Sequence, residues 1–473
     1  MRARRGLVVL LLGLAAPLAA QERPATEGAA EGRAATQRPP NVILILADDL
    51  GYGDLSIQGS TDLRTPFIDS IAREGVSCTN GYVTAPRCAP TRSALLTGRY
   101  QQRFGCELDA EHGLGAEVTL ATRLKAAGYA TGIVGKWHLG KAEADQPGAR
   151  GFDEFFGFLG GSSNYLPSAE KGVLPNILRN HEPAGETSYL TDALEREAVA
   201  FLERHRDEPF FLYLPFNAAH TPLQATEADL ARFPDIADPT RRTYAAMVAS
   251  MDDAIGAVLA KLRELGLDER TLVVFLNDNG GPLAKGVWNG SSNGPLRGQK
   301  SSTYEGALRV AYFLRWPGTL PAGKTFDAPV SSLDLFPTAL RAAGVELDPS
   351  WALDGVDLLP CLLGRTEAPP HDVLLWRFNF PPAYPTLHKW AIRQGDWKLV
   401  HSPDRHSTEA QQAAPPELYD LAHDPGETHD VGAEHPELVR SLHARWSAWD
   451  AGLPAVTPGS GGGDAEPGAD DDG

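Results

Sequence analysis

A cysteine and an arginine four residues apart are the most chemically suggestive pair in the chain, within "TAPRCAPTRSALLTGR" at residues 84–99. Pro90 suits the first turn of a helix and Gly98 suits its C-terminal cap, so the stretch predicts a helix that begins near Cys88. The N-terminal end of a helix favours negative charge. Arg92 opposes that dipole, so an anionic ligand explains it better than helix propensity does. The alternative is a buried structural cysteine beside a surface arginine.

Two pairs of oxygen-bearing residues directly follow apolar runs. Asp48 and Asp49 follow "NVILILA", and Asp278 and Asn279 follow "TLVVFLN". Hard oxygen ligands of this kind suit Ca²⁺ or Mg²⁺ and do not suit zinc. Helix capping at the first pair and a plain turn at the second are the alternatives. If both pairs lie at strand ends of one sheet, metal binding becomes the better interpretation.

Four further residues could assist acid–base or electrostatic chemistry: Lys136 and His138 in "GKWHLG", His220 in "NAAHTP" and Lys300 in "RGQKSSTYEG". Lys136 and His138 are two positions apart, so they face the same way in an extended segment. The alternative interpretations are a solvated lysine for Lys136 and a surface histidine for His138. For the other two they are a core histidine for His220 and an ordinary exposed lysine for Lys300.

The segments that must position these residues alternate between strand and helix patterns. Apolar runs at residues 41–49, 129–138, 209–216 and 271–281 predict strands, and the periodicity of residues 117–128, 191–207 and 245–265 predicts helices. Fully apolar strands alternating with helices indicate a large α/β fold, with a mostly parallel sheet sandwiched by helices. Ligands of such sheets bind beyond the carboxyl ends of the strands, so the polar residues are expected to converge there.

The character of the chain changes near residue 380. The segments "KWAIRQGDWKLVHSP" and "PELYDLAHDPGE" resemble antiparallel strands, and "HPELVRSLHARWSAWD" has the periodicity of a helix. We therefore expect a catalytic α/β domain at residues 40–375 and a smaller C-terminal α+β domain at residues 376–455.

Both ends of the chain differ from this core. Residues 1–20 combine three arginines, an apolar run and small residues, which predicts a signal peptide cleaved after Ala20 and export to the periplasm or the medium. No other segment is apolar enough to span a membrane. Residues 21–39 read as a disordered linker and residues 456–473 as a disordered acidic tail.

Composition limits the possible partners. The chain has 473 residues, of which 42% are hydrophobic and 22% charged, and a formal net charge of −18, which argues against nucleic-acid binding and against anionic membranes. Four cysteines, at positions 78, 88, 106 and 361, are too few for a disulfide-built scaffold. In an exported protein we expect one or two structural bridges, for example Cys78 with Cys88 or Cys106. If Cys88 is reserved for chemistry, one of the other three is left over.

The stretch "CAPTRSALLTGR" resembles the signature of the type I, formylglycine-dependent sulfatases. The arylsulfatase-like and N-acetylgalactosamine-6-sulfatase-like members are the most similar. Further matching segments are "NVILILADDLGYGDL", "GKWHLG", "RGFDEFFGF", "NAAHTP", "NDNGG", "LRGQKSSTYEGALRVAYFLRWPG" and "GDWKLV" with "ELYDLAHDPGE". The resemblance implies an alkaline-phosphatase-like fold. It also implies hydrolysis of a sulfate ester, expected on a sulfated carbohydrate or glycosaminoglycan.

The resemblance also implies roles for single residues. A maturation enzyme would oxidise Cys88 to formylglycine. A divalent ion, expected to be Ca²⁺ rather than Mg²⁺, would be held by five ligands: Asp48, Asp49, Asp278, Asn279 and an oxygen of the modified residue 88. A hydroxyl of the hydrated aldehyde would attack sulfur with help from Asp278. The sulfate oxygens would be neutralised by Arg92, Lys136 and Lys300. His220, assisted by Lys300, would protonate the departing alcohol, and His138 would take the proton that allows sulfate to leave. An unmodified thiol would stop at a thiosulfate ester, so the cysteine is interpreted as a precursor.

Several points stay open. Arg87 departs from the small or aliphatic residue that many members carry, and Ser162 or Ser163 stands near a polar contact of the family without aligning directly. We expect Arg87, Arg103 and the loop at residues 281–299 to be candidates for substrate contact. One alternative function is a phosphoester or phosphonate hydrolase of the same superfamily, in which Thr91 or Ser93 would act as nucleophile. Another is a secreted, non-catalytic binder of sulfated glycans in which Cys88 is not modified.

Overall fold

The protein is described by a computed structural model that covers residues 38–108, 113–379, 388–404 and 407–454. The predicted signal peptide, nearly all of the predicted linker and the acidic tail lie outside the described residues. From Pro39 onward the chain belongs to one compact unit. The division into domains at residues 375 and 376 stays a prediction. None of the described helices is long and apolar enough to cross a membrane.

The main sheet has ten strands with a parallel centre. Their spatial order is β11 (Lys324–Phe326), β2 (Val76–Cys78), β10 (Tyr312–Arg315), β9 (Thr271–Asn277), β1 (Asn41–Ala47), β8 (Phe210–Pro215), β4 (Ala130–Lys136), β5 (Glu154–Phe158), β6 (Leu178–Arg179) and β7 (Glu182–Pro183). The run from β9 to β5 is parallel throughout. Antiparallel pairs appear on both flanks, at β10 with β9 and β2 and at β6 with β5 and β7. The predicted parallel sheet is therefore confirmed for the centre, and the complete sheet is mixed.

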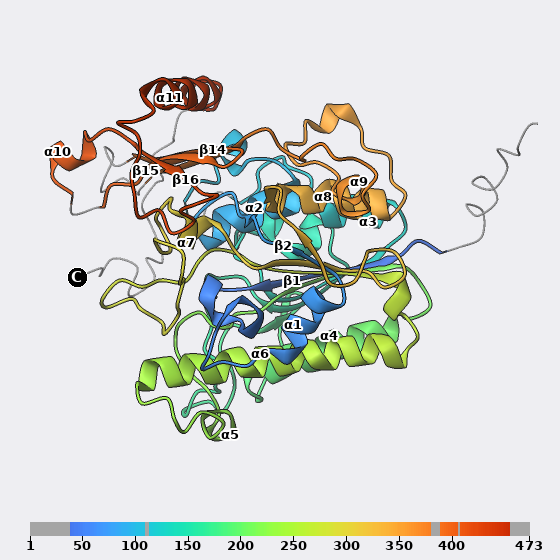
Figure 1. Ribbon diagram of the computed structural model, residues 1–473. Coiled ribbons are helices and arrows are strands. Elements are labelled where there is room, and N and C mark those ends of the chain that lie inside the picture. Colours follow the sequence, from blue (N-terminus) through green and yellow to red (C-terminus); the bar gives the residue numbers. More distant parts are fainter. Residues whose placement is uncertain (1–37, 109–112, 380–387, 405–406, 455–473) are drawn as a thin grey trace, which may run out of the picture. The chain divides into compact units, whose positions relative to one another are not determined.

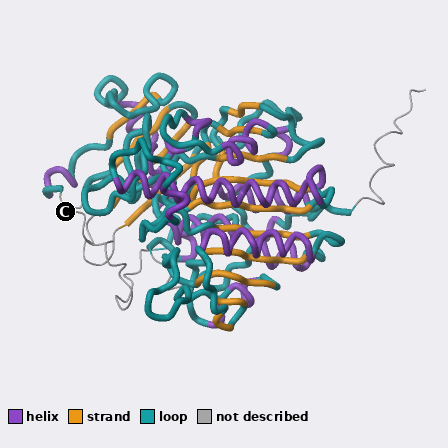
Figure 2. The backbone as a smooth tube through the Cα atoms, turned by 90° about the horizontal axis from the view of Figure 1, so that it is seen from below, coloured by secondary structure: helices purple, strands orange, loops and turns teal. Residues whose placement is uncertain are grey.

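Helices cover both faces of this sheet (Figures 1 and 2). One face carries α1 (Pro66–Arg73), α4 (Leu190–Arg204) and α6 (Pro239–Glu264), and the other carries α2 (Cys88–Thr97), α3 (Leu120–Ala126), α8 (Leu335–Ala342) and α9 (Leu359–Leu362). Side chains alternate between the faces of a strand. Accordingly, Ile43 and Ile45 of β1 pack in the first core, and Leu44 and Leu46 pack in the second. Burial on both faces explains why β1 is apolar at every position after Asn41.

The predicted helices are present with shifted ends. α6 begins at Pro239, six residues before the predicted start, because Asp238 caps it by accepting from the backbone N–H of Arg241. Its methionines, Met247 and Met251, are fully buried, as the apolar stripe predicted. The remaining short elements are β3 (Gly81–Tyr82), β12 (Val330–Ser331), α5 (Glu227–Leu230), α7 (Glu305–Leu308) and α10 (Glu409–Gln412).

A second, antiparallel sheet follows near the C-terminus. It contains β13 (Leu374–Asn379), β14 (His388–Gln394), β15 (Trp397–His401) and β16 (Glu417–Asp420), in that order. The helix α11 (Pro436–Asp450) packs on it, with the rings of Trp390 and Trp446 stacked at 4.6 Å between centroids. The predicted α+β character of this region is confirmed, and β13 is an additional strand.

The expectation of structural disulfides is wrong. All four cysteines are buried, and none of them forms a disulfide bond. Cys78 packs inside the apolar layer between the sheet and α2, whereas Cys88 stands at the start of α2. An apolar core already holds these segments together, so the fold does not depend on cross-links.

Candidate active site

The ends of β1 and β9 bring the two oxygen-bearing pairs together. These strands are parallel neighbours although about 230 positions separate them, and Ala47 pairs with Asn277 at their carboxyl ends. The next residues therefore meet. The backbone N–H of Asp49 donates to Oδ1 of Asp278 (3.3 Å), and Nδ2 of Asn279 donates to Oδ1 of Asp49 (2.6 Å). The exposed fraction of each of the four residues is 3% or less.

Cys88 reaches the same place from α2. It is the first residue of the helix, and Gly98 ends the helix in the left-handed conformation at φ 67°, as the sequence predicts. The Sγ atom of Cys88 and one carboxylate oxygen each of Asp48 and Asp278 all lie within 4.8 Å of one another. The predicted convergence of the thiol with the carboxylates is therefore what the fold produces.

Arg92 is not a surface residue. Its side chain is fully buried, and both Nε and Nη2 donate to Oδ2 of Asp278, at 3.0 and 2.7 Å. Its Nη1 donates to the carbonyl of Lys136 (3.1 Å), and Nη2 lies 3.5 Å from Oδ2 of Asp48. The guanidinium thus joins the ends of β1, β4 and β9 from one position on α2.

Two lysines complete the cationic part of the cluster. Nζ of Lys136 donates to Oδ2 of Asp48 (2.6 Å), with both side chains fully buried. Nζ of Lys300 donates to Oδ2 of Asp49 (2.9 Å), and 14% of the lysine side chain is exposed. The solvated alternatives for these lysines are therefore wrong. Each of the two aspartates that follow β1 is therefore bonded to its own lysine.

The two histidines differ in their surroundings. His220 places Nε2 3.6 Å from Oδ2 of Asp49, while its Nδ1 lies 2.7 Å from the carbonyl of Thr221. A carbonyl only accepts, so Nδ1 carries a proton. His138 is half-buried, and its Nδ1 has no hydrogen-bond partner within the described residues. Burial and the positive charge of Lys136 hold the pKa of His138 well below its usual range, so this imidazole is neutral at neutral pH.

Burial and charge set the ionisation of the acidic groups. For Asp48, burial acts to raise the pKa, but the surrounding cations, led by Lys136, outweigh it and lower the pKa. For Asp278, burial and repulsion by Asp48 raise the pKa against the charge of Arg92. Burial also raises the pKa of the Cys88 thiol to about 11, despite the nearby Lys136. The carboxylates lie close together in a buried site, so their negative charges must be stabilised by the neighbouring cations.

Two oxygen atoms in this cluster lack partners. Oδ1 of Asp48 and Oδ1 of Asn279 are buried and accept no hydrogen bond from the described residues. Buried polar atoms are nearly always satisfied, so an unsatisfied pair points to a missing partner. Carboxylate and amide oxygens are ligands of Ca²⁺ and Mg²⁺. The donor set therefore fits a divalent cation.

Comparison with known proteins decides the family. The family model described as "Sulfatase" matches residues 40–345, and the model described as "N-sulphoglucosamine sulphohydrolase, C-terminal" matches residues 299–450. The chain belongs to the sulfatase family. It is accordingly a sulfuric ester hydrolase, and the resemblance stated from its motifs is confirmed.

Individual relatives agree with this assignment. The sulfatase is 35% identical to N-acetylgalactosamine-6-sulfatase from Sus scrofa, over 86% of this chain and 84% of that protein. It is also 35% identical to arylsulfatase A from Homo sapiens, over 86% and 87% of the two chains. The crystal structure of Ps i-CgsB in complex with k-i-k-neocarrahexaose superposes with a TM-score of 0.81 at 36% identity, covering 89% of this chain and 94% of that one.

The sulfatase also uses residues that the sequence analysis did not single out. Nδ2 of Asn289 donates to the carbonyls of Asp49 (3.2 Å) and Ala219 (3.1 Å), which fastens the segments after β1 and β8 to each other. The hydroxyl of Tyr165 lies 2.9 Å from the carbonyl of His220, and it donates to backbone carbonyls of the turn that contains His220. Asn289 lies in the loop at residues 281–299, which the sequence analysis named as a whole for substrate contact, but no local signal identified this residue.

The candidates for substrate contact stay predictions. Arg87 is half-buried at the N-cap of α2, next to Cys88. Arg103 donates to both carboxylate oxygens of Asp354, at 2.7 and 2.6 Å, and 35% of its side chain is exposed. Oγ of Ser163 lies 3.4 Å from the carbonyl of Asn164, which leaves the serine contact open.

Proposed function

We propose that this sulfatase hydrolyses a sulfate ester on a sulfated carbohydrate or glycosaminoglycan, with Cys88 converted to formylglycine as the nucleophile. The observation that carries the proposal is the position of Cys88 within 4.8 Å of two carboxylates, with buried cations bonded to the same carboxylates. One relative is named N-acetylgalactosamine-6-sulfatase, and another was solved in complex with k-i-k-neocarrahexaose. Both names support a glycan substrate.

The ionisation of residue 88 supports its role as a precursor. The thiolate is the nucleophilic form of cysteine, and a pKa of about 11 leaves very little thiolate at neutral pH. An unmodified Cys88 would therefore be a poor nucleophile at this position. Conversion by a formylglycine-generating maturation enzyme removes that obstacle.

The metal site in this proposal consists of Asp48, Asp49, Asp278 and Asn279. A bound Ca²⁺ would act as a Lewis acid that polarises oxygen atoms at the reacting centre. Arg92, Lys136 and Lys300 neutralise the sulfate oxygens, which stabilises the charge that develops during transfer. Their present carboxylate partners keep these cations in place and desolvated before the substrate arrives.

The two histidines divide the proton transfers. His220 holds a proton on Nδ1 against the carbonyl of Thr221 and presents Nε2 toward Asp49. When Nε2 is protonated as well, it donates that proton to the departing alcohol oxygen. His138 is neutral, and its unpartnered Nδ1 accepts a proton in the step that releases sulfate. The different surroundings of the two rings therefore suit His220 to act as the acid and His138 to act as the base.

The function is tested by comparing matched esters. We expect the matured enzyme to hydrolyse 4-nitrophenyl sulfate faster than 4-nitrophenyl phosphate. Release of sulfate from a panel of sulfated mono- and oligosaccharides then identifies the sugar and the position. Faster cleavage of the phosphate would favour the alternative of a phosphoester hydrolase. An unmodified Cys88 in protein from the native host, together with no turnover of either ester, would favour a glycan-binding module.

Metal binding is tested by thermal unfolding. A ligand that binds only the folded state stabilises it by about 2.7 kcal/mol at a hundred times its Kd. We therefore expect Ca²⁺ to raise the Tm of chelator-treated protein by several degrees, and Mg²⁺ to raise it less. Asp278→Asn removes a charged ligand with little change of shape and should abolish most of this increase.

Asp252→Asn provides a matched control for the metal experiment. Asp252 is equally buried, but it accepts the backbone N–H groups of Phe67 and Ile68 at the start of α1 and stands outside the cluster. Whatever its own melting temperature, the control should keep the Ca²⁺-dependent increase in Tm. An increase of the same size in Asp278→Asn would show that the ion binds elsewhere.

We also propose that the protein is exported. The support is the pattern of residues 1–20, and N-terminal sequencing of mature protein from the native host should begin at Gln21. A mature chain that begins at Met1 would overturn this proposal.

A further inference from the structure

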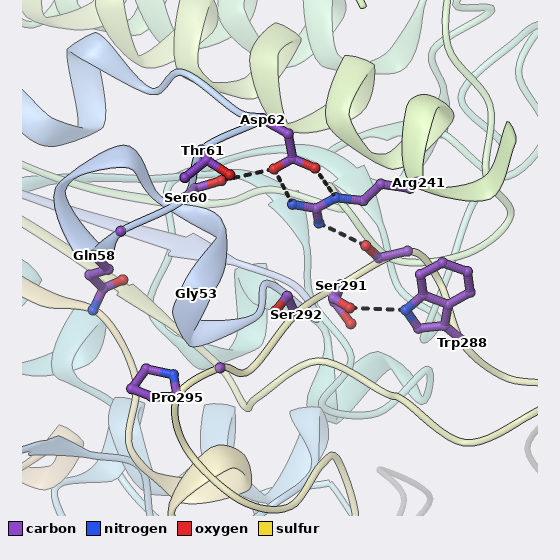
Figure 3. A pocket seen from close by; sticks show the side chains of 13 residues that line it. Gly53, Gln58, Ser60, Thr61, Asp62, Arg241, Trp288, Ser291, Ser292 and Pro295 are labelled. Carbon is purple, nitrogen blue, oxygen red and sulfur yellow. Dashed lines mark hydrogen bonds and ion pairs between the residues drawn. The ribbon is translucent and has the colours of Figure 1, made fainter. Parts of the chain in front are cut away.

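A large cavity lies beside the catalytic cluster and has no role in the chemistry described above. Its volume is about 750 Å³, within the range of roughly 300–1,000 Å³ that is usual for ligand sites. The walls come from residues 53–62, from residues 288–295 and from Arg241 in the first turn of α6 (Figure 3). The cavity is therefore formed by two segments that continue directly from the catalytic residues.

The topology places this cavity at the catalytic edge of the sheet. The helix α6 connects β8 to β9, which both run parallel to β1, so its first turn lies near the carboxyl ends of these strands. Asn289, a neighbour of Trp288, donates to the carbonyl of Asp49. The wall of the cavity is thus bonded to the backbone of a proposed metal ligand. A polymer that presents one sulfate to the cluster could extend into the cavity.

Trp288 supplies a fixed apolar surface at this cavity. The residue is 37% exposed, which is unusual for so large an apolar ring, and its Nε1 donates to the carbonyl of Ser291 (2.9 Å). Figure 3 shows this bond and the ring at the edge of the cavity. A ring held in this way offers one broad apolar face while its polar end is already satisfied. Such a face suits the C–H face of a pyranose ring.

The cationic group of the cavity is already committed. Nε and Nη2 of Arg241 donate to the two oxygens of Asp62 (2.8 and 2.7 Å), and Nη1 donates to Asp54 (2.6 Å) and to the carbonyl of Gly290 (2.8 Å). These bonds use four of the five donors of a guanidinium. Of the described residues that line the cavity, Arg241 is the single cation. A sulfate group would therefore find little to bind here and would meet the carboxylate of Asp62.

The remaining polar groups favour hydroxyl groups. The side chain of Asp62 is 38% exposed and can accept further hydrogen bonds. Ser60, Thr61 and Ser292 also line the cavity. The hydroxyl of Ser60 already donates to Asp62 (3.1 Å), so those of Thr61 and Ser292 are the ones that can donate or accept. An aromatic face, a carboxylate acceptor and these hydroxyls together match a neutral, polyhydroxylated ligand.

We propose that this cavity is a subsite for an unsulfated sugar residue of the substrate chain, with Trp288 as the stacking surface and Asp62 as a hydroxyl acceptor. The inference rests on the proposed function, because it requires a glycan substrate. It adds that the enzyme recognises at least one neutral sugar next to the sulfated one.

The subsite is tested by saturation-transfer NMR with neutral oligosaccharides. The probes are unsulfated tetra- to hexasaccharides of galactose, glucose, mannose and fucose, and the protein is the full chain with Ca²⁺. We expect at least one probe to receive saturation from the wild-type protein. Trp288→Ala should reduce that signal by about fivefold or more, because the stacking surface is lost. Trp288→Phe, which keeps an aromatic face, should retain a substantial part of it.

Leu283→Ala is the matched control, since Leu283 is similarly exposed at 40% on the same loop but does not line the cavity. It should keep the wild-type signal. A probe panel that gives no transfer with the wild type, or an equal signal in Trp288→Ala, would overturn the subsite.

A kinetic measurement separates this proposal from the proposed function. The ratio of kcat/KM for a sulfated oligosaccharide to that for 4-nitrophenyl sulfate should fall about tenfold in Trp288→Ala, because the aryl ester is too small to fill the cavity. An unchanged ratio would remove the subsite and leave the sulfatase assignment intact. Absence of aryl sulfate turnover would instead count against the proposed nucleophile, while the NMR result would still decide the subsite.

Discussion

Replacing Cys88 with alanine is expected to lower kcat/KM for 4-nitrophenyl sulfate by roughly 10⁴-fold or more, the scale that follows removal of a nucleophile. Alanine cannot be converted to formylglycine, so the nucleophile is absent. The fold should survive, because alanine removes one buried sulfur atom at the start of α2 and retains helix propensity. Initial rates, with circular dichroism to confirm folding, measure this effect.

Cys78→Ala is the matched control for that substitution. Cys78 is also a buried, unpaired cysteine, but it lies in β2 within the apolar core. We expect Cys78→Ala to keep kcat within about threefold of the wild type and to melt slightly earlier, as for other lost core atoms. Equal losses of activity in the two variants would contradict a special role for residue 88.

The mass of the tryptic peptide at residues 88–92 gives an independent check on the wild-type protein. Conversion to formylglycine exchanges one sulfur and two hydrogens for one oxygen, so the peptide becomes lighter. Protein from the native host is required, since a host without the maturation enzyme would leave the thiol intact. An unmodified peptide from active native protein would refute the proposed nucleophile.

The second large effect is expected from Lys136→Met. Lys136 and Asp48 form a fully buried pair at 2.6 Å, and removing one partner of such a pair typically costs about 3–5 kcal/mol. The same substitution removes a cation from the proposed sulfate site, which should lower kcat by roughly 10²–10³-fold. Denaturant unfolding and initial rates measured on the folded protein give the two numbers separately.

Lys398→Met separates the two effects. Lys398 is equally buried, and its Nζ lies 2.9 Å from both Glu305 and Glu427 beside the C-terminal sheet. This variant should lose a similar amount of stability but keep kcat within a few-fold of the wild type. If Lys136→Met were no slower than Lys398→Met at equal folded concentration, Lys136 would have only a structural role.

Local patterns in the chain were sufficient for much of the fold. The apolar run at residues 42–47 predicted most of β1, because a strand buried on both faces needs apolar side chains pointing both ways. The helix at Cys88 followed from Pro90 and Gly98, which act within one or two turns. The antiparallel flanks were missed, since β10 and β2 are short and their direction depends on long connections.

The candidate site shows the same division. Residue types and strand ends indicated which side chains would gather, and the family motifs indicated the chemistry. Their partners came from the tertiary structure: Arg92 bonds to Asp278 across 186 positions, and Asn289 bonds to Asp49 across 240. No spacing in the sequence encodes such pairs, because strand order decides which ends are neighbours.

The sequence by itself therefore determined most of the elements and the family, and it indicated the residues that we propose for the chemistry, because these depend on short-range periodicity and on motifs a few residues long. Only the tertiary structure decided that no disulfide joins the four cysteines, that Arg103 pairs with Asp354, and that a cavity with an exposed Trp288 adjoins the cluster. These properties depend on which distant surfaces pack together, and packing is settled by the complete arrangement of the sheet and its helices.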